Sequence, residues 1–449
     1  MAPATQMAAP PPRGGSFRVL RTARVAPSSP DGVPSLRQRA VPLTFLDAMW
    51  LPTPPVDRVF LYRLGAADDD VDAVLSRLAD SLSRVLHVFY PLAGRLRLTP
   101  GKTNRYELFY QPGDAVAFTV AEHDDGVGVD ELAADDPREV AKIAPLAPEL
   151  PDGGAVLAVQ ATVLPPARRG LALGVTVHHA ACDGSSSTHF LHTWAAACAG
   201  AVVLPKPPVI DRTFIRERED LYDIMVNRTK EESDKFSSPD VADNKLLATF
   251  TLSGEILQNI KDICHIHAAL ASDVEAENNP RNHGRAHFVF PTDHRARMEP
   301  RVPDKYLGNC VGPCFASAPK KEIAAADAED GLFTTCAAIA AAIDEGTRYD
   351  PGYWERCREH VRGMSTSDGP PLAVAGSPRF RVYDVDFGFG RPTKVDVVSV
   401  AKTGAISVAE GRGGGIEVGV GLPPERMERF RRCFTDAVTW LSSPSSSDT

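Results

Sequence analysis

The sequence predicts an α/β protein with two lobes, and three observations support this prediction. Helix-like and strand-like segments are mixed in both halves of the chain. Its 449 residues are enough for more than one hydrophobic core. Near the middle, the segment Leu-Pro-Lys-Pro-Pro at 204–208 cannot form regular structure, because proline lacks an amide donor and blocks a helix.

These observations divide the chain into five parts. We expect a disordered leader at 1–15, an N-terminal lobe at 16–203, a crossover linker at 204–226, a C-terminal lobe at 227–442 and a disordered tail at 443–449. The leader has no basic start followed by an apolar core, so it does not predict a secretory signal. The Ser-rich tail is typical of disordered chain ends.

In the N-terminal half, residues 71–86 place apolar side chains three and four positions apart, which predicts an amphipathic helix. A second helix is expected at 187–197. The segment Leu-Ala-Leu-Gly-Val-Thr-Val at 171–177 is short, apolar and bounded by turn residues, which predicts a buried strand. Further strands are expected at 17–25, 106–110, 116–120 and 155–163.

In the C-terminal half, an Ala-rich apolar stretch at 324–343 predicts a buried helix, and 424–441 predicts a second helix. Gly-Arg-Gly-Gly-Gly at 411–415 lacks the Lys-Ser/Thr of a phosphate-binding loop. It predicts instead a hairpin turn between strands at 406–410 and 416–420. Further strands are expected at 247–252, 287–290, 382–385 and 394–400.

Composition and charge exclude several classes of protein. The chain has 49 Lys and Arg against 58 Asp and Glu, a net charge of −9, whereas a nucleic-acid-binding protein usually has a basic face. No stretch reaches the roughly 18 consecutive apolar residues that span a bilayer. The cysteines are scattered, and Cys310 and Cys314 have no second Cys/His pair at zinc-ligand spacing. We therefore expect a reduced, cytoplasmic protein without a metal.

The segment His-His-Ala-Ala-Cys-Asp-Gly at 178–184 is the sharpest candidate for chemistry. A histidine at the end of a buried strand and beside small residues can reach a cleft, and its pKa near neutrality suits a general base. Asp183 could orient the imidazole, or could fix the turn by pairing with a cation elsewhere. The alternative is a loop histidine followed by a helix-capping aspartate.

Several motifs give the chain a resemblance to a known family. Residues 178–184 match the H-x-x-x-D-G motif of the plant BAHD acyltransferases, and Asp-Phe-Gly-Phe-Gly at 386–390 resembles their D-F-G-W-G motif, with Phe389 in place of Trp. Tyr-Leu-Gly-Asn-Cys at 306–310 is similar to the Y-F-G-N-C signature of the anthocyanin and phenolic glucoside acyltransferase branch. Other segments that resemble this branch lie at 43–51, 89–96, 293–297 and 399–410.

The resemblance implies a two-lobed fold like that of chloramphenicol acetyltransferase, and acyl transfer from a coenzyme A thioester to a hydroxyl. The family histidine matched by His179 is the general base. The family aspartate matched by Asp183 points away from the cleft and pairs with an arginine, here Arg295. Asp386 is described as essential in the family, although it resembles a structural aspartate remote from the reacting atoms. The expected catalytic residues are therefore His179, Asp183 and Asp386, with structural support from Arg295, Gly184, Gly388 and Gly390.

The same resemblance implies malonyl-CoA or hydroxycinnamoyl-CoA as co-substrate, without a permanently bound cofactor. The acceptor would be a flavonoid, anthocyanin or phenolic glucoside, and the protein a monomer without nucleic-acid or membrane partners. A malonyl donor requires a cation for its free carboxylate. No Lys or Arg lies between Asp183 and Lys206, so the nearest motif-borne cations are Arg295 and Arg297.

A second departure from the family concerns 264–286. Family members carry a buried apolar helix in this interval, whereas the sequence here is polar and short. The family helix near the donor channel is therefore expected to be missing. This predicts an alternative function, an acyltransferase-like protein that binds a ligand or partner without turnover.

The remaining aromatic and histidine candidates have simpler interpretations. We expect Phe45, Trp50 and Phe89 in the hydrophobic core rather than at a substrate platform. His189 and His192 lie three residues apart on the helix expected at 187–197, but no third ligand is evident, so a metal site is not expected there.

Overall fold

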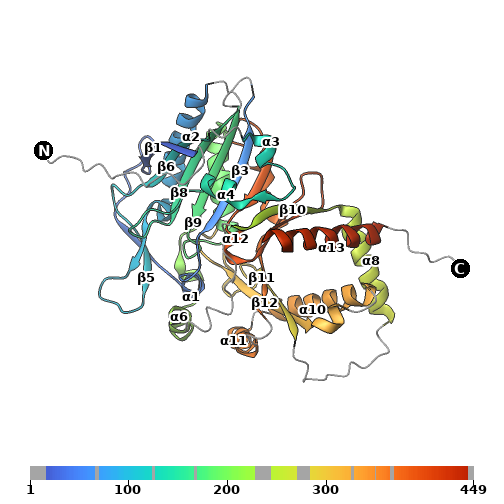
Figure 1. Cartoon of the computed structure of the whole chain (residues 1–449). Helices are drawn as coiled ribbons and strands as arrows, with labels where there is room; N and C mark the ends of the chain where they lie inside the picture. Colours follow the sequence, from blue (N-terminus) through green and yellow to red (C-terminus); the bar gives the residue numbers. More distant parts are fainter. Residues whose placement is uncertain are drawn as a thin grey trace.

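The structure is a computed structural model, and the residues that it describes form two bodies that lie side by side (Figure 1). The expected leader at 1–15 and tail at 443–449 lie outside the described residues, as do 271–283 within the interval expected to lack a family helix. Side chains are not described at 264–270 and 328. The described ranges are 17–65, 70–123, 127–165, 169–227, 244–270, 284–324, 328–348, 350–364 and 369–442.

The first body is built on a six-stranded sheet. In spatial order its strands are β1 (Phe17–Val25), β6 (Val116–His123), β8 (Leu157–Leu164), β9 (Gly170–Val177), β3 (Val56–Arg63) and β14 (Lys394–Val397). Neighbouring strands are antiparallel except β6 and β8, which are parallel. Two helices, α2 (Val71–Leu86) and α5 (Gly184–Cys198), contact each other and share the main hydrophobic core with this sheet.

The second body is built on a seven-stranded sheet. Its strands, in spatial order, are β12 (Val311–Pro319), β11 (Arg285–Asp293), β13 (Leu372–Gly376), β15 (Ile406–Glu410), β16 (Ile416–Leu422), β10 (Leu246–Leu252) and β7 (Arg138–Glu139). The long helices of this body are α8 (Gly254–Leu270), α10 (Ala328–Thr347) and α13 (Pro424–Ser442). Helix α10 contacts β12, whereas α13 contacts β10 and β16 (Figure 1).

Smaller elements connect these layers. A three-stranded sheet has the order β2 (Arg39–Pro42), β5 (Tyr106–Tyr110), β4 (Arg95–Leu98). The short helices are α1 (Phe45–Ala48), α3 (Val129–Leu132), α4 (Val140–Ile143), α6 (Glu219–Val226), α9 (Lys320–Ile323), α11 (Tyr353–Gly363) and α12 (Val400–Thr403). Short 3₁₀ turns lie at Tyr90–Ala93, Ala144–Leu146, Arg212–Phe214, Pro378–Phe380 and Val382–Asp384. Helix α1 is important for the site, because it follows β2 and precedes β3, the strand that pairs with β9.

Each half of the chain contributes one strand to the sheet of the other half: β14 of the second half lies in the first sheet, and β7 of the first half lies in the second sheet. β14 pairs with β3, and β7 pairs with β10. A buried ion pair joins the two contributed strands, with Arg138 Nη1 2.8 Å from the Asp396 carboxylate. Phe387 also lies in the core of the first body. The sheets therefore cross the division expected at 204–226, and residues near 387–397 belong to the first body although they follow the linker.

Most helices and strands expected from periodicity are present. Helix α2 has the expected bounds 71–86, and β9 begins one residue before the expected strand at 171–177. The described chain also contains six strands that the pattern did not predict, β2, β3, β4, β7, β12 and β13, of which β3 and β12 are the longest. Buried charges at Asp57 and Arg58 interrupt the apolar pattern of β3, and β12 contains a glycine and two prolines.

Three expected elements differ from the structure. The strand expected at 382–385 is wrong, because Arg381 has a left-handed backbone (φ 51°) and Tyr383 donates its amide to the Glu410 carboxylate instead of a strand partner. The strand expected at 394–400 ends at Val397. The helix expected to be buried at 324–343 is α10, which begins at Ala328 and leaves Ile343 44% exposed.

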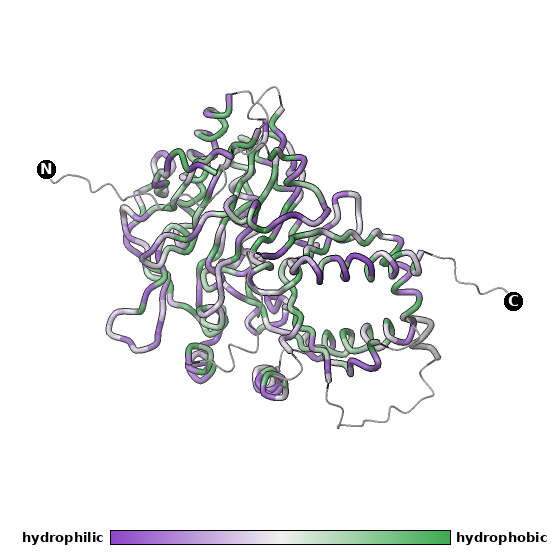
Figure 2. Tube along the Cα trace, in the orientation of Figure 1, coloured by the Kyte–Doolittle hydropathy of each residue, from purple (hydrophilic) through white to green (hydrophobic). Residues whose placement is uncertain are grey.

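Apolar burial is concentrated in the first body. The largest cluster of buried side chains surrounds β3, β9, α2 and α5, whereas the second body holds small clusters around Phe250 and Cys314. Figure 2 shows hydrophilic residues recurring along α13. Within the described ranges, no helix combines the length and apolar character needed to cross a membrane.

Candidate active site

His179 lies two residues beyond the end of β9, in the connection to α5. β9 pairs along its full length with β3 and β8, which fixes the start of this connection. Asp183 ends it as the N-cap of α5, because its carboxylate accepts the Ser186 backbone N–H at 2.9 Å. The segment at 178–184 is thus a short connection anchored at both ends, and it holds His179 at a fixed place.

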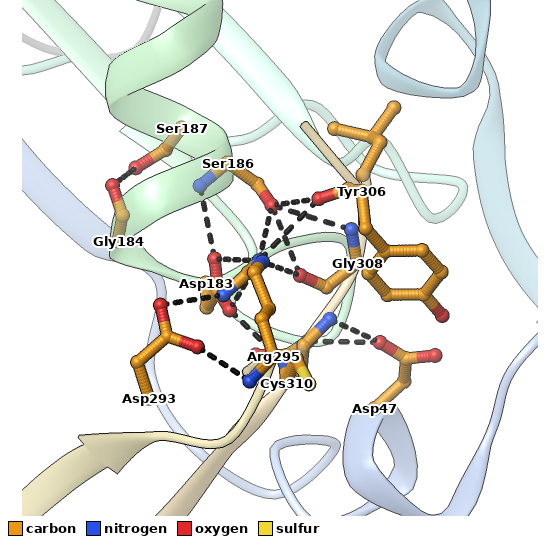
Figure 3. Close-up of polar contacts among 12 residues, drawn as sticks. Asp47, Asp183, Gly184, Ser186, Ser187, Asp293, Arg295, Tyr306, Gly308 and Cys310 are labelled. Atoms are coloured by element: carbon orange, nitrogen blue, oxygen red, sulfur yellow. Dashed lines mark hydrogen bonds and ion pairs between the residues drawn. The ribbon is translucent and has the colours of Figure 1, made fainter. Parts of the chain in front are cut away.

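Asp183 also pairs with Arg295, as the family resemblance implies. Arg295 Nη2 donates to both carboxylate oxygens, at 2.8 and 3.0 Å, and both side chains are buried (Figure 3). The Cys310 backbone N–H adds a third donor at 3.0 Å. Because Asp183 follows β9 and Arg295 follows β11, this pair joins the two bodies beside His179. The aspartate is therefore both a helix cap and one partner of a buried ion pair.

The segment at 306–310 lies against the first turn of α5. Ser186 Oγ lies 2.8 Å from the Tyr306 carbonyl oxygen and 3.0 Å from that of Gly308 (Figure 3). Arg295 Nη2 also reaches Ser186 Oγ at 3.1 Å. These polar contacts place the next residue of the segment, Asn309, beside His179.

Asn309 is the residue that contacts the imidazole of His179. Its amide Nδ2 donates to Asp47 Oδ1 at 3.0 Å and to the His179 backbone carbonyl at 2.9 Å. Both amide hydrogens are thus used, and the amide Oδ1 is the atom that lies 3.1 Å from His179 Nδ1. Because an amide oxygen can only accept a hydrogen bond, Nδ1 of the neutral imidazole carries the proton.

Asp47 fixes the orientation of Asn309. It is fully buried on α1, where Thr44 donates both its backbone N–H and its hydroxyl to Oδ2 at 2.9 Å. The Asn309 backbone N–H donates to Oδ1 at 2.8 Å, and Arg212 Nε lies 3.8 Å from Oδ2. A flipped Asn309 amide would turn its oxygen toward this carboxylate, so the observed orientation is the one that satisfies both groups.

The environment of His179 suits a neutral imidazole. Burial lowers its pKa below the ordinary 6.5, while Asp183 and the Asn309 hydrogen bond act in the opposite direction. With the proton on Nδ1, the second ring nitrogen Nε2 keeps its lone pair. No hydrogen bond from another described residue occupies Nε2. This nitrogen can therefore accept a proton from a bound molecule.

Trp50 packs against the main hydrophobic core as expected, but it also reaches the site, which was not expected. Its indole stacks on the His179 ring, with centroids 3.7 Å apart and an angle of 15° between the planes. The side chain is half-buried, and its Nε1 has no hydrogen-bond partner in the described part of the chain. Phe45 and Phe89, by contrast, are buried in the main core as expected.

Asp386 makes its contacts within its own turn. Its Oδ1 accepts the backbone N–H of Gly388 at 2.7 Å and that of Gly390 at 3.0 Å. Both glycines have a left-handed backbone, with φ of 92° and 101°. None of the contacts between described residues joins Asp386 to His179, Asp183 or Arg295. The geometry therefore gives Asp386 a structural place in the turn at 386–390.

Gly184 is needed for close packing at the start of α5. A Cβ atom at this position would lie 2.6 Å from the ring of Phe380. His192, about two turns further along α5, lies with its Nε2 3.1 Å from the Phe380 carbonyl oxygen. His189 is engaged with the Lys206 carbonyl at 2.9 Å. Among the described residues no group of His, Cys, Asp or Glu side chains could hold a metal ion.

The two arginines considered for a malonyl carboxylate are both engaged. Arg295 forms an ion pair with Asp183. Arg297 is exposed and donates a hydrogen bond to the Asp293 backbone carbonyl. A cation for a donor carboxylate is thus not provided by the segment at 293–297.

Sequence reasoning missed three residues at this site. Asp47, Trp50 and the orienting role of Asn309 were not predicted, although all three belong to segments whose likeness to the family was recognised, 43–51 and 306–310. The family resemblance pointed to these segments. No local pattern, however, predicts a contact between residues 130 positions apart, such as His179 and Asn309.

Comparison with known families supports the resemblance seen in the motifs. The model of the Transferase family matches residues 17–268 and 266–437, which is nearly the whole chain. The chain is 31% identical to phenolic glucoside malonyltransferase 1 of Arabidopsis thaliana, over 92% of this chain and 96% of that protein. It is 27% identical to coumaroyl-CoA:anthocyanidin 3-O-glucoside-6''-O-coumaroyltransferase 2 of the same plant, with coverage of 92% and 96%.

The fold has a counterpart among solved structures. The crystal structure of vinorine synthase superposes with a TM-score of 0.67 and 20% identity, covering 92% of this chain and 96% of the other. The two-body arrangement in Figure 1 is therefore an established fold.

Proposed function

Because this chain belongs to the Transferase family, the BAHD acyltransferases, and is an acyltransferase that uses acyl-CoA, we propose that it acylates a hydroxyl of a phenolic or flavonoid glucoside. The donor would be malonyl-CoA or a hydroxycinnamoyl-CoA. Two relatives support this range, since one is named for malonyl and the other for coumaroyl transfer, and both names include a glucoside.

The observation that carries the mechanism is the orientation of Asn309. Its amide oxygen faces His179 Nδ1, so the proton lies on Nδ1 and Nε2 is free to act as the general base. Asp47 holds the amide in this orientation from the opposite side. The residues of α1 and of 306–310 thus prepare the imidazole before any substrate binds.

In the proposed reaction, His179 Nε2 removes the proton of the acceptor hydroxyl as its oxygen attacks the thioester carbonyl. The new C–O bond gives a tetrahedral oxyanion, which collapses as the C–S bond breaks. The imidazolium then returns the proton to the departing sulfur, and free coenzyme A leaves as a thiol. Positioned acid–base catalysis contributes about 10²–10⁴-fold, and the rest comes from alignment of the substrates and stabilisation of the oxyanion.

Asp183 has an indirect role in this proposal. Its carboxylate is occupied by Arg295 and by the backbone N–H groups of Ser186 and Cys310. It therefore positions the connection that carries His179 and does not exchange a proton with substrate. Asp386 is assigned to the stability of the turn at 386–390 for the same reason.

The test is a panel of donors and acceptors with the purified protein. Malonyl-CoA and p-coumaroyl-CoA are each incubated with a phenolic glucoside, and thiol release is followed together with the mass of the product. We expect thiol release that depends on the glucoside, and a product heavier by one acyl group. Coenzyme A binding in a calorimetric titration, without thiol release for any pair, would contradict turnover and favour the alternative binding protein.

A further inference from the structure

The proposed mechanism gives no role to Arg58, a buried arginine on β3. Arg58 is 7% exposed and lies between Val175 of β9 and Val397 of β14 in the sheet register. Alternation along β3 places it on the same face as Phe60 and Tyr62, which is the face covered by α5. Arg58 is therefore a further candidate cation for a ligand, besides Arg295 and Arg297.

The guanidinium of Arg58 is poorly satisfied for a buried charge. Its single hydrogen bond runs from Nη1 to Thr188 Oγ1 of α5 at 3.5 Å, and Nε has no partner among the described residues. No carboxylate of the described chain lies within 4.0 Å of it to form an ion pair. Burial lowers the pKa of Arg58 to about 10, which is the cost of removing the charge from water. A group that hydrogen-bonds Arg58 would recover part of this cost.

A buried carboxylate oxygen is unsatisfied in the same region. Glu410, at the end of β15, accepts the Tyr383 backbone N–H with Oε1 at 2.8 Å, but its Oε2 is enclosed and has no hydrogen-bond partner in the described chain. Burial raises the pKa of Glu410, and the field of Glu410 acts on Arg58 although the two groups form no ion pair. Arg58 contacts α5, and β15, which carries Glu410, contacts the turn at Pro378–Phe380 that packs against α5. The unused donor and the unused acceptor therefore both lie beside α5.

These groups surround the α5 side of the connection that carries His179. Thr188, the partner of Arg58, lies in the second turn of α5. Burial raises the pKa of Cys182 in the connection, and the charge of Arg58 acts to lower it. On the other side, the first residue of α5, Gly184, packs against Phe380, which precedes the turn that brings Tyr383 to Glu410. Arg58 and Glu410 are thus contributed by two sheets that meet next to the catalytic connection.

We infer that Arg58 and Glu410 form the subsite for the sugar ring of the acceptor glycoside, an inference that rests on the proposed function. Each sugar hydroxyl both donates and accepts a hydrogen bond, so one ring can satisfy a guanidinium and a carboxylate together. A donor carboxylate would be attracted by Arg58 but repelled by Glu410. The combined charge of the two side chains is near zero, which suits a neutral polyol better than an anion.

The experiment measures equilibrium binding of a phenolic glucoside and of its aglycone to the full-length protein, in the presence of coenzyme A. We expect the wild type to bind the glucoside more tightly than the aglycone. Arg58→Met and Glu410→Gln should each weaken glucoside binding about tenfold, which corresponds to about 1.4 kcal/mol, and should change aglycone binding by less than about twofold. Arg63→Met is the matched control, because Arg63 lies exposed on the same strand, and it should change neither.

Three results would overturn the inference. Equal binding of glucoside and aglycone by the wild type would contradict a sugar subsite. An equal loss of glucoside and aglycone binding in the variants would contradict it as well. Binding tests the sugar subsite, whereas thiol release tests the proposed function. If the protein shows the expected binding pattern without thiol release, the subsite is supported and the proposed activity is contradicted. Glu410→Gln preserves size but removes the charge and replaces one acceptor oxygen with a donor, so it keeps the test valid if Arg58→Met does not fold. A selective rise in KM for malonyl-CoA over acetyl-CoA in Arg58→Met, with unchanged glucoside binding, would assign Arg58 to the donor and contradict the inference.

Discussion

The two sheets of this protein differ sharply in how far their strands are buried. β8 and β9 of the first body are buried along their whole length. β13 and β15, at the centre of the second sheet, are only half-buried, and β11 is buried at no position. Leu372 of β13 is 45% exposed. One sheet therefore rests on a packed apolar core, whereas the described part of the other is held mainly by its ladder and by polar contacts.

This difference shows how the site is built. His179 and α5 depend on the packed body, which fixes their backbone. The second body contributes Arg295 and Asn309, and it does so through buried hydrogen bonds and an ion pair at the junction. The site should consequently be most sensitive to changes in the junction and the first core, and least sensitive to changes within the second sheet.

The largest effect is expected from breaking the ion pair at the junction. Arg295→Met leaves the Asp183 carboxylate buried without its cation, and removing one partner of such a pair costs about 3–5 kcal/mol. We expect a marked fall in the denaturant midpoint together with loss of thiol release. In the double variant Asp183→Asn with Arg295→Met no charge is buried and the side chain at 183 can still cap α5, so it should recover much of the stability without recovering activity. An unchanged midpoint in the single variant would mean that the pair does not hold the two bodies together.

The next effect compares the two cores directly. Leu173→Ala removes a fully buried side chain of β9 and should cost about 2–5 kcal/mol. Val374→Ala on the half-buried β13 should cost about 1 kcal/mol, because less apolar surface is lost from contact. Chemical denaturation of both variants measures the difference. Equal losses would show that the second sheet is packed as tightly as the first.

A smaller change is expected when the amide at the junction is removed. Asn309→Ala takes away the acceptor that keeps the His179 proton on Nδ1, so a fraction of the imidazole presents N–H rather than a lone pair to the substrate. We expect kcat to fall roughly tenfold, less than the 10²–10⁴-fold attributed to the general base itself, with little change in KM for acyl-CoA. Asn259→Ala in α8 is a matched control and should leave kcat unchanged. If kcat were retained in Asn309→Ala, Asn309 would not set the tautomer.

The mildest test changes only the pH. The base form of His179 is required, and burial lowers its pKa, so this form persists as the pH falls to the ordinary value of 6.5. We expect kcat/KM to decline on the acid side with a midpoint below pH 6.5. Asn309→Ala should move this decline to still lower pH, because the Asn309 hydrogen bond raises the pKa of His179. A decline with its midpoint above pH 7 would contradict the buried, neutral imidazole.

Local patterns in the sequence predicted the elements that carry the site, but not the contacts between them. The apolar spacing of 71–86 and the run at 171–177 led to α2 and β9, and the position of His179 after that strand followed. The pair of Asp183 with Arg295 came from the family resemblance, since no local rule connects residues 112 positions apart.

The missed features share a physical cause. Arg58 and Asp57 are charged residues in a buried strand, so the apolar pattern that marks a strand is interrupted where β3 passes through the core. Trp50 was assigned to the core because it is large and apolar, yet its partner is the imidazole of a distant segment. In each case tertiary contacts, rather than composition or periodicity, decide the role of the residue.

The central claim is that His179 Nε2 removes the proton of the acceptor hydroxyl. The most direct measurement is single-turnover thiol release with saturating acyl-CoA and glucoside, comparing His179→Ala with the neighbouring control His178→Ala. The mechanism predicts that His179→Ala lowers the rate by about 10²–10⁴-fold, with coenzyme A binding retained, while His178→Ala stays within about threefold of the wild type. Near-normal turnover by His179→Ala would contradict the general-base assignment.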